Sequence, residues 1–454
     1  MPLISTNPAT GEIIKEYPEL TPEAVTEKII QAEIAYTEWQ KTTFAERAGK
    51  MKKLAEILRA KKQILGRIMS LEMGKPITAA TAEVEKCAWV ADYYADNAEK
   101  ILQDELTATE MQESYVRFDP MGIILAIMPW NFPFWQVVRF AAPALMAGNV
   151  GLLKHASCVS GCALALEEIF LAAGFPVGAF TTLLIGSDKV ETVIADDRVK
   201  AVTLTGSEAA GSKVASLAGK LIKKTVLELG GSDPFIILSD ANIAAAAAEG
   251  VLARLQNAGQ SCIAGKRFIV VADRYDEFLR EYLKVWQTFT VGDPLDEATK
   301  VGPLISAKAV SEIDNQVQSS IALGARLVAG GKRWGDRGFF YEPTILAEVK
   351  KGMPAYDEEV FGPVAAVIKV ADTTEAIRVA NDTPYGLGAS LWTADLSLAK
   401  TLATQIQSGC VFVNSMVKSD PRLPFGGIKK SGFGRELSHY GIKEFVNIKT
   451  VVIK

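Results

Sequence analysis

The sequence predicts an α/β protein with two domains, each built on a sheet of mostly parallel strands. Residues 21–103 carry helical signals, beginning with Thr21-Pro22-Glu23, where proline stands at the first helical position. From Tyr115 onward, short apolar runs alternate with helical stretches, which is the pattern of parallel strands joined by helices. The alternation starts again after Gly230, and this repetition predicts the second domain.

The individual elements follow from the apolar runs and the turn residues between them. In the first domain we expect strands at residues 122–128, 151–154, 181–185 and 199–205, with a helix over 158–173. In the second domain we expect strands at residues 234–238, 267–271, 363–369 and 409–414, and helices beginning near Ala241, Tyr275, Ser311 and Thr374. The β-branched tail, residues 443–454, would leave a free strand edge unless a neighbouring subunit covers it.

Length and composition indicate a globular chain with several cores. The chain has 454 residues, 49% of them hydrophobic, which suggests two or three domains. Its 49 Lys and Arg against 53 Asp and Glu form no long block of one sign, and this argues against a nucleic-acid partner. The most apolar run, residues 122–128, is far shorter than the roughly 20 residues of a membrane-spanning helix. The first residues lack the features of an export signal, so we expect a cytoplasmic protein.

Cysteine and histidine usage narrows the chemistry. The five cysteines are odd in number and scattered, so reduced thiols are expected. The two histidines, His155 and His439, have no partner at a metal-ligand or triad spacing. Cys158 and Cys162 are four residues apart, but two ligands do not make a zinc site, and we interpret them as packing residues. We therefore expect catalysis without histidine and without a metal.

The segment around Gly206 has the features of an anion site. The expected strand 199–205 runs into Gly206-Ser207 and then into an alanine-rich helix, so that free backbone N–H groups would face an anion. No G-x-G-x-x-G follows a strand, and the glycine spacing of a nucleoside-triphosphate loop fails by one residue. An ordinary strand-to-helix turn explains the pattern equally well.

Three further segments supply reactive or polarising groups. Cys262 follows the small, polar stretch Asn257-Ala-Gly-Gln-Ser at a helix end, where a substrate can approach a thiol, although a buried structural cysteine also fits. Glu228 ends a strand before two glycines and can act as a general base; the alternative is a surface glutamate in a turn. Asn131 is held between prolines and aromatic residues in Pro129-Trp-Asn-Phe-Pro133, as an oxyanion hole requires.

Together these groups resemble the aldehyde dehydrogenase superfamily, from the Asn7-Pro-Ala-Thr-Gly-Glu12 opening to the end of the chain. Seven motifs occur in the family's order: Pro-Trp-Asn-Phe-Pro at 129–133, Lys154, Thr205-Gly-Ser207, Glu228-Leu-Gly-Gly231, Gly259-Gln-Ser-Cys262, Glu359-Val-Phe-Gly-Pro363, and Pro424-Phe-Gly-Gly427 with Ser431-Gly-Phe-Gly-Arg-Glu436. Chance agreement of seven ordered motifs is negligible.

The resemblance implies the family fold: an α/β cofactor-binding domain (1–104 and 121–230), an α/β catalytic domain (231–430) and a small β oligomerisation element (105–120 and 431–454) that forms homodimers or homotetramers. It implies that Cys262 is the nucleophile, that Asn131 and the Cys262 backbone N–H hold the oxyanion, and that Glu228 activates the water that releases the acid. The implied cofactor-binding residues are Trp130, Lys154, Ser157, Gly206, Ser207, Glu359 and Phe361.

The resemblance also indicates the cofactor. Members of the family that prefer NAD⁺ commonly carry glutamate three residues after the lysine at 154, where this chain has Ser157. A serine hydroxyl can donate to a 2′-phosphate and does not repel it, so we expect NADP⁺ to be preferred and NAD⁺ to be possible. The alternative is that Ser157 only caps the following helix.

For the substrate we expect succinic semialdehyde. Arg139 and Ser419 match positions at which relatives with this specificity hold the distal carboxylate. Gln256 stands where such relatives often carry a second arginine, and an ion-paired structural role for Arg139 is the alternative. Three other functions stay open: a broad aliphatic aldehyde dehydrogenase, a relative that transfers the acyl group to coenzyme A, and a silent binding protein. Glu228 argues against the second, and Cys262 together with Glu228 argues against the third.

Overall fold

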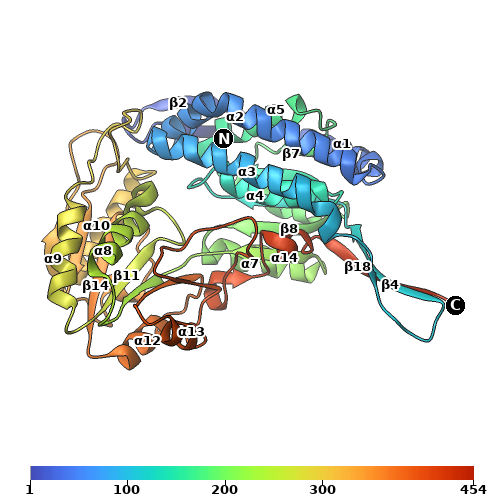
Figure 1. Cartoon of the computed structure of the whole chain (residues 1–454). Coiled ribbons are helices and arrows are strands. Elements are labelled where there is room, and N and C mark those ends of the chain that lie inside the picture. Colours follow the sequence, from blue (N-terminus) through green and yellow to red (C-terminus); the bar gives the residue numbers. More distant parts are fainter. Residues whose placement is uncertain (1) are drawn as a thin grey trace.

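A computed structural model describes residues 2–454, whose strands form four sheets (Figure 1). The helices are α1 Pro22–Trp39, α2 Phe44–Met73, α3 Ile77–Ile101, α4 Trp135–Met146, α5 Ser160–Ala172, α6 Val190–Ala195, α7 Glu208–Lys220, α8 Ile243–Leu255, α9 Tyr275–Trp286, α10 Ala307–Ala322, α11 Pro354–Asp357, α12 Thr373–Asn381, α13 Leu396–Ala403 and α14 Ser438–Ile442. Short 3₁₀ turns are η1 Ser157–Val159, η2 Ser187–Lys189, η3 Gln256–Gly259 and η4 Lys429–Ser431.

The strands divide between the two domains and two small sheets. They are β1 Leu3–Thr6, β2 Ile13–Tyr17, β3 Glu105–Leu106, β4 Glu113–Pro120, β5 Ile123–Met128, β6 Val150–His155, β7 Phe180–Thr182, β8 Val199–Thr205, β9 Lys224–Glu228, β10 Asp233–Ile237, β11 Gly265–Val271, β12 Arg326–Ala329, β13 Thr344–Ala347, β14 Val364–Val370, β15 Gly388–Trp392, β16 Cys410–Val413, β17 Gly432–Phe433 and β18 Val446–Ile453.

The helical opening of the chain is confirmed as α1, α2 and α3. Thr21 caps α1 by accepting a hydrogen bond from the backbone N–H of Ala24 at 3.2 Å, as the sequence predicts. Thr43 and Glu46 form a capping box at the start of α2, and Gly74, with φ of +79°, ends that helix in the left-handed region. Helix α3 begins at Ile77, directly after this turn, and forms one wall of a cavity described below.

The first domain contains a sheet with strand order β17-β9-β8-β5-β6-β7, in which only β17 runs antiparallel. The four strands expected between residues 122 and 205 are present, but β7 stops at Thr182 rather than 185. There the backbone N–H of Ile185 bonds to the carbonyl of Leu183, a local turn that takes the chain away from the sheet.

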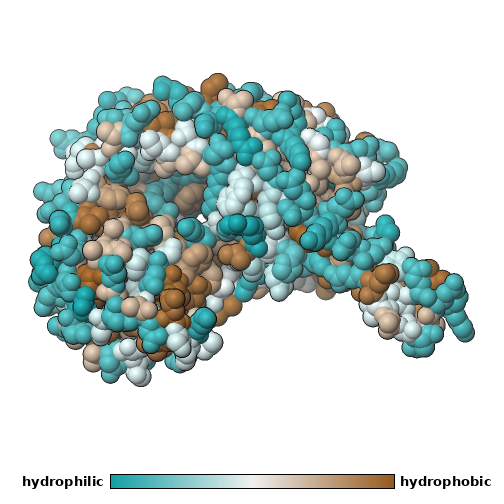
Figure 2. Space-filling model, viewed as in Figure 1, coloured by the Kyte–Doolittle hydropathy of each residue, from teal (hydrophilic) through white to brown (hydrophobic). Residues whose placement is uncertain are grey.

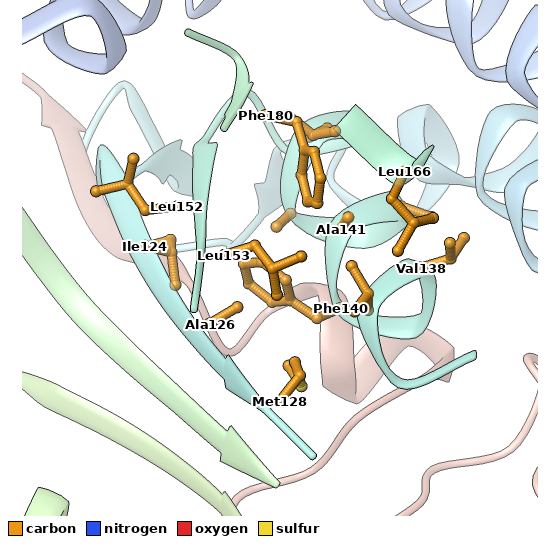
Figure 3. Packing of buried hydrophobic residues seen from close by; sticks show 14 of the residues in the cluster. Ile124, Ala126, Met128, Val138, Phe140, Ala141, Leu152, Leu153, Leu166 and Phe180 are labelled. Atoms are coloured by element: carbon orange, nitrogen blue, oxygen red, sulfur yellow. The ribbon is translucent and has the colours of Figure 1, made fainter. Parts of the chain in front are cut away.

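The core of this domain lies between the sheet and helices α4 and α5. In Figure 3, Phe140 and Val138 from α4 and Leu166 from α5 point toward Leu153 and Phe180 from the strands, and all five are at most 3% exposed. Every residue of α4 is buried, so this helix is fixed on all sides. Burial of each large apolar side chain contributes on the order of 1.5–3 kcal/mol.

The second domain contains a sheet of order β12-β13-β14-β11-β10-β15-β16, with parallel strands from β13 to β16 and an antiparallel edge strand β12. The four strands expected from the sequence are present. Sequence reasoning missed the edge strand β12, its neighbour β13 and the interior strand β15. The residues of β15, Gly388-Ala-Ser-Leu-Trp392, lack β-branched side chains and become a strand through pairing with β10 and β16.

Strands β4 and β18 pair antiparallel along their whole length and, with β3, form an arm that projects from the body (Figure 1). Apolar surface lies exposed on the arm (Figure 2). The exposed apolar residues of its strands include Leu106, Ile448 and Val452. The arm begins at Val446, because residues 431–445 belong to the body: Gly432 pairs with Glu228 and Ile442 is buried in the first core. Of the oligomerisation element expected over 431–454, residues 446–453 form the arm, and the division into domains stays a prediction.

Across residues 2–454, no helix combines the length and the apolar character needed to cross a bilayer.

Candidate active site

Cys262 lies where two cavities meet. One, the α3–α4 cavity, has a volume of about 280 Å³ and is lined by residues of those two helices and of the loop 417–425. The other, the β8–α7 cavity, has a volume of about 290 Å³ and is lined by Thr205, Gly206, Ser207 and the loop 129–131. Cys262 and Gln136 line both. A thiol in this position can reach molecules bound on either side.

The backbone before Cys262 is held in an uncommon conformation. Asn257 and Ala258 have φ of +54° and Gly259 has φ of +72°, three consecutive residues in the left-handed region. A Cβ on Gly259 would lie 2.1 Å from the carbonyl oxygen of Gly362, so only glycine fits. Left-handed backbone at a non-glycine residue costs about 1–3 kcal/mol and is concentrated at functional sites. This loop is thus shaped to present Cys262.

Two buried cations hold that loop from behind. Arg254 donates to the carbonyl oxygens of Gly259 at 3.2 Å and Val360 at 2.9 Å, and also to that of Gly362. Lys266 donates to the carbonyl of Cys262 at 2.8 Å and makes an ion pair with Glu359 at 3.4 Å. Sequence reasoning missed both residues. A cation four residues after a candidate nucleophile, as Lys266 is, was the available signal.

Asn131 is oriented by three hydrogen bonds. Its Nδ2 donates to the carbonyl of Gln260 at 3.1 Å, and its Oδ1 accepts from Nε2 of Gln136 at 3.2 Å. Its backbone carbonyl accepts from Nδ2 of Asn257 at 2.8 Å. The amide group therefore faces the loop of Cys262, and its second N–H hydrogen is available to an oxygen bound there.

His155 fixes the loop 129–133 on the other side. Its Nε2 lies 2.9 Å from the carbonyl oxygen of Pro133, and its Nδ1 accepts from the N–H of Ala156 at 3.0 Å. Burial lowers the pKa of His155 to about 4, so the ring is neutral at physiological pH. His155 positions the loop of Asn131 rather than transferring protons.

The thiol of Cys262 is protonated in the resting arrangement. Burial raises its pKa to about 12, although Lys266 and Arg139 act in the opposite direction. A group of this kind attacks only after its proton has passed to a base.

Glu228 ends β9 and is only 2% exposed. Burial raises the pKa of its carboxyl well above the usual range, the charge of Glu436 raises it further, and Oε1 has no hydrogen-bond partner among the described residues. A raised pKa makes the ionised carboxylate a stronger base, so Glu228 can act as a general base once it has lost its proton. Its burial excludes the alternative of a surface glutamate in a turn.

The three expected substrate residues, Arg139, Gln256 and Ser419, line the α3–α4 cavity together with Cys262. Arg139 also forms a buried ion pair with Glu436, and its guanidinium carbon lies 4.8 Å from the ring centre of Phe425. The structural role that the sequence left open for Arg139 is therefore present alongside its place in the cavity.

Lys86 is a further cavity residue that sequence reasoning missed. Its Nζ donates to Oγ of Ser419 at 2.8 Å, and both residues line the α3–α4 cavity. The signal was spacing: Ala79, Ala82, Glu83 and Lys86 recur at helical intervals on α3 and share one face.

The β8–α7 cavity gathers most of the expected cofactor residues. Trp130 and Phe361 line it with their ring centres 5.9 Å apart in an edge-to-face arrangement, and Gly206 and Glu359 line it as well. Ser207 lines it and caps α7 by accepting from the N–H of Ala210 at 3.3 Å. The free N–H groups at the start of α7 therefore border this cavity.

Lys154 and Ser157 lie apart from that group. Lys154, at the end of β6, lines a third cavity of about 730 Å³ that runs along α6 and α7. Ser157 begins η1, three residues later, and neither η1 nor α5 is capped by a side-chain hydrogen bond. The helix-capping alternative for Ser157 is therefore not realised.

Comparison with known proteins shows the family of the chain. A model of the aldehyde dehydrogenase family matches residues 2–451. The chain is 51% identical over 453 residues to a probable succinate-semialdehyde dehydrogenase [NADP⁺] of Synechocystis sp., with all of both chains covered. It is 50% identical over 456 residues to succinate-semialdehyde dehydrogenase [NADP⁺] 1 of Mycobacterium tuberculosis, again over the full length of both. The crystal structure of succinic semialdehyde dehydrogenase from Streptococcus pyogenes in complex with NADP⁺ superposes with a TM-score of 0.97 at 42% identity, covering 99% of each chain.

Proposed function

Because the chain belongs to the aldehyde dehydrogenase family, we propose that it oxidises succinic semialdehyde to succinate with NADP⁺ as the preferred electron acceptor. The observation that carries this proposal is that Arg139 and Ser419 line the same cavity as Cys262. An aldehyde that reaches the thiol from that cavity would place a distal carboxylate against a guanidinium and a hydroxyl. The full-length relatives named for this activity support the same reading.

The chemistry begins with addition of the Cys262 sulfur to the aldehyde carbon. A base takes the thiol proton, the C–S bond forms, and the carbonyl oxygen becomes an oxyanion held by Nδ2 of Asn131 and the backbone N–H of Cys262. The space beside Trp130 and Phe361 would hold the nicotinamide of NADP⁺, which would supply the hydride acceptor for this carbon. The acyl group then remains on Cys262 as a thioester.

Hydrolysis of the thioester falls to Glu228. The carboxylate takes a proton from water, the water oxygen bonds to the acyl carbon, and the C–S bond breaks to release succinate and restore the thiol. The orphaned Oε1 of Glu228 is the acceptor for that proton. Asn131 holds the second oxyanion as it holds the first.

The residues present fit a dinucleotide with a 2′-phosphate. Lys154 lines its cavity and makes no ion pair among residues 2–454, although Asp188 and Glu191 line the same cavity. Its ammonium group would therefore contribute charge to a phosphate bound there. Ser157 places a hydroxyl, not a carboxylate, three residues on. We assign the pyrophosphate to Gly206 and Ser207 at the start of α7, a ribose to Glu359, and the nicotinamide to the space beside Trp130 and Phe361.

We infer that the arm of β3, β4 and β18 joins copies of this chain into a homodimer or homotetramer. The outer edge of β18 has unpaired backbone groups and exposed apolar side chains, which a second copy would cover. The free thiol that catalysis needs agrees with a reducing compartment such as the cytoplasm.

A broad aliphatic aldehyde dehydrogenase is the second candidate. The α3–α4 cavity is lined by Phe132, Trp135 and Phe425 as well as by charged groups, and Arg139 already has an acidic partner. Steady-state kcat/KM for succinic semialdehyde and for butanal, each with NADP⁺ and with NAD⁺, distinguishes the two. The proposal requires succinic semialdehyde with NADP⁺ to be the best pair, and equal rates with butanal would favour the second candidate.

A further inference from the structure

Helix α3 brings a lysine into the α3–α4 cavity. Ala79, Ala82, Glu83 and Lys86 face this cavity from consecutive turns of the helix. Opposite them stand Arg139 from α4 and Ser419 from the loop before Phe425, while Cys262 lies at one end. The space thus joins the thiol to a cluster of cationic and hydroxyl groups.

The charges in this cavity are not equally available. Arg139 forms its ion pair with Glu436, and Lys75 forms one with Glu83, which also accepts from the backbone N–H of Phe134 and Trp135 at 2.9 Å. Both of these cations are therefore matched by a carboxylate. Lys86 has no carboxylate within 4 Å among residues 2–454. The nearby Asp420 is paired with Arg422.

Lys86 is nevertheless held in one place. Its Nζ donates to Oγ of Ser419 at 2.8 Å and lies 4.2 Å from the ring centre of Trp135. Ser419 is 7% exposed and has this lysine as its donor. An ammonium group has three N–H donors, so two remain for a ligand that also reaches the serine.

We propose that Lys86 determines specificity by binding the distal carboxylate of the substrate, together with Ser419 and Arg139. It supplies the positive charge that Gln256, also in this cavity, lacks. The ligand class is a short aldehyde that carries a carboxylate at its far end. This inference rests on the proposed function and adds to it Lys86 as the cation without an ion pair that is held inside the cavity, since Lys418, which also lines it, is exposed.

The test compares Lys86→Met with Lys100→Met, a matched control at the exposed end of the same helix. The readout is the ratio of kcat/KM for succinic semialdehyde to kcat/KM for butanal, which cancels effects on the chemistry common to both aldehydes. We expect Lys86→Met to lower this ratio about 10- to 100-fold, through KM for succinic semialdehyde, and Lys100→Met to leave it unchanged. NADP⁺ affinity and the melting temperature establish that each variant is folded, and Lys86→Gln serves as a second variant.

Binding without turnover gives an independent readout. Succinate should inhibit butanal oxidation by the wild type, and its inhibition constant should rise about 10-fold or more in Lys86→Met, whereas Lys86→Arg should keep most of the affinity. A ratio within about threefold of wild type in Lys86→Met would overturn the inference while leaving the proposed function intact. An equal fall of this ratio in Lys418→Met would also overturn the inference. Lys418 is the exposed cation at the cavity edge, so such a fall would show that the effect is not specific to Lys86. If the wild type itself does not prefer succinic semialdehyde over butanal, the proposed function fails, and this inference fails with it.

Discussion

Arg139 and Glu436 form an ion pair in which the side chains are only 4% and 6% exposed. After burial, the charge of Glu436 is the largest influence that raises the pKa of Glu228, and the charge of Arg139 lowers it. The candidate carboxylate-binding arginine and the candidate general base therefore belong to one electrostatic network. Substitutions in it will affect both substrate binding and acid release.

Replacing Arg139 by alanine should lower kcat/KM for succinic semialdehyde by about one to two orders of magnitude, because a charge-assisted contact is worth roughly 1.5–3 kcal/mol. It should also lower the melting temperature, since Glu436 is left buried without a partner. Arg139→Met combined with Glu436→Gln separates the effects: stability should recover and the substrate preference should not. An unchanged kcat/KM for succinic semialdehyde in Arg139→Ala would show that this residue does not bind the substrate.

Cys262→Ala should abolish aldehyde oxidation and leave NADP⁺ affinity close to wild type. The thiol supplies the bond to the substrate, whereas the groups assigned to the dinucleotide surround the loop without depending on sulfur. Turnover assays and NADP⁺ titration by protein fluorescence check the two halves of this prediction. Residual turnover above the background rate would contradict covalent catalysis by Cys262.

Glu228→Gln should separate the two chemical steps. The amide cannot accept a proton from water, so reduced cofactor should appear in a burst close to one equivalent per active site and then slowly. Stopped-flow absorbance measures the burst. A steady rate equal to that of the wild type would assign the base to another residue.

Ser157→Glu should reverse the cofactor preference in favour of NAD⁺. A carboxylate three residues from Lys154 repels a 2′-phosphate and can accept from ribose hydroxyls. Ser157→Ala is the control for the loss of the hydroxyl alone and should change the preference less. The comparison is kcat/KM for NADP⁺ against NAD⁺, and a variant with glutamate that still prefers NADP⁺ would show that other residues select the cofactor.

The preference for succinic semialdehyde over butanal should fall as pH rises through about 8. Burial and the charge of Arg139 lower the pKa of Lys86 to about 8, while Cys87, Glu83 and Asp420 act in the opposite direction. The substrate carboxylate stays ionised throughout this range, so the loss comes from deprotonation of the ammonium group. The ratio of the two kcat/KM values against pH measures it. A ratio that does not change between pH 6 and pH 10 in the wild type would contradict this assignment.

Sequence reasoning located the groups that stand in local motifs and missed those assembled by folding. Cys262, Glu228 and Asn131 each stand within three residues of a glycine or proline in the sequence, such as Gly259 before Cys262. Lys86 and Ser419 are 333 residues apart, and no spacing connects them until α3 packs beside the loop. The sequence left open whether Arg139 binds the substrate or forms an ion pair. Its acidic partner, Glu436, lies 297 positions away, and only the fold brings the two together.

The fold shows the same division. Strand β8 coincides with the expected range 199–205, because its run of apolar and β-branched residues indicates a strand unaided. Strand β15 was missed, because Gly388 and Ser390 become part of a sheet through their neighbours β10 and β16 rather than through their own preference. The conformational preferences of the residues predict strands such as β8. Strands such as β15 form through pairing with neighbouring strands and are not predicted from their own residues.

The central claim is that the acyl group of succinic semialdehyde is carried on the sulfur of Cys262. It is tested most directly by mixing Glu228→Gln with succinic semialdehyde and NADP⁺, quenching with acid at the end of the burst, and mapping the peptides by mass spectrometry. The account predicts one succinyl group on the peptide that contains Cys262, in an amount equal to the reduced cofactor formed. A burst of reduced cofactor with Cys262 unmodified would contradict it.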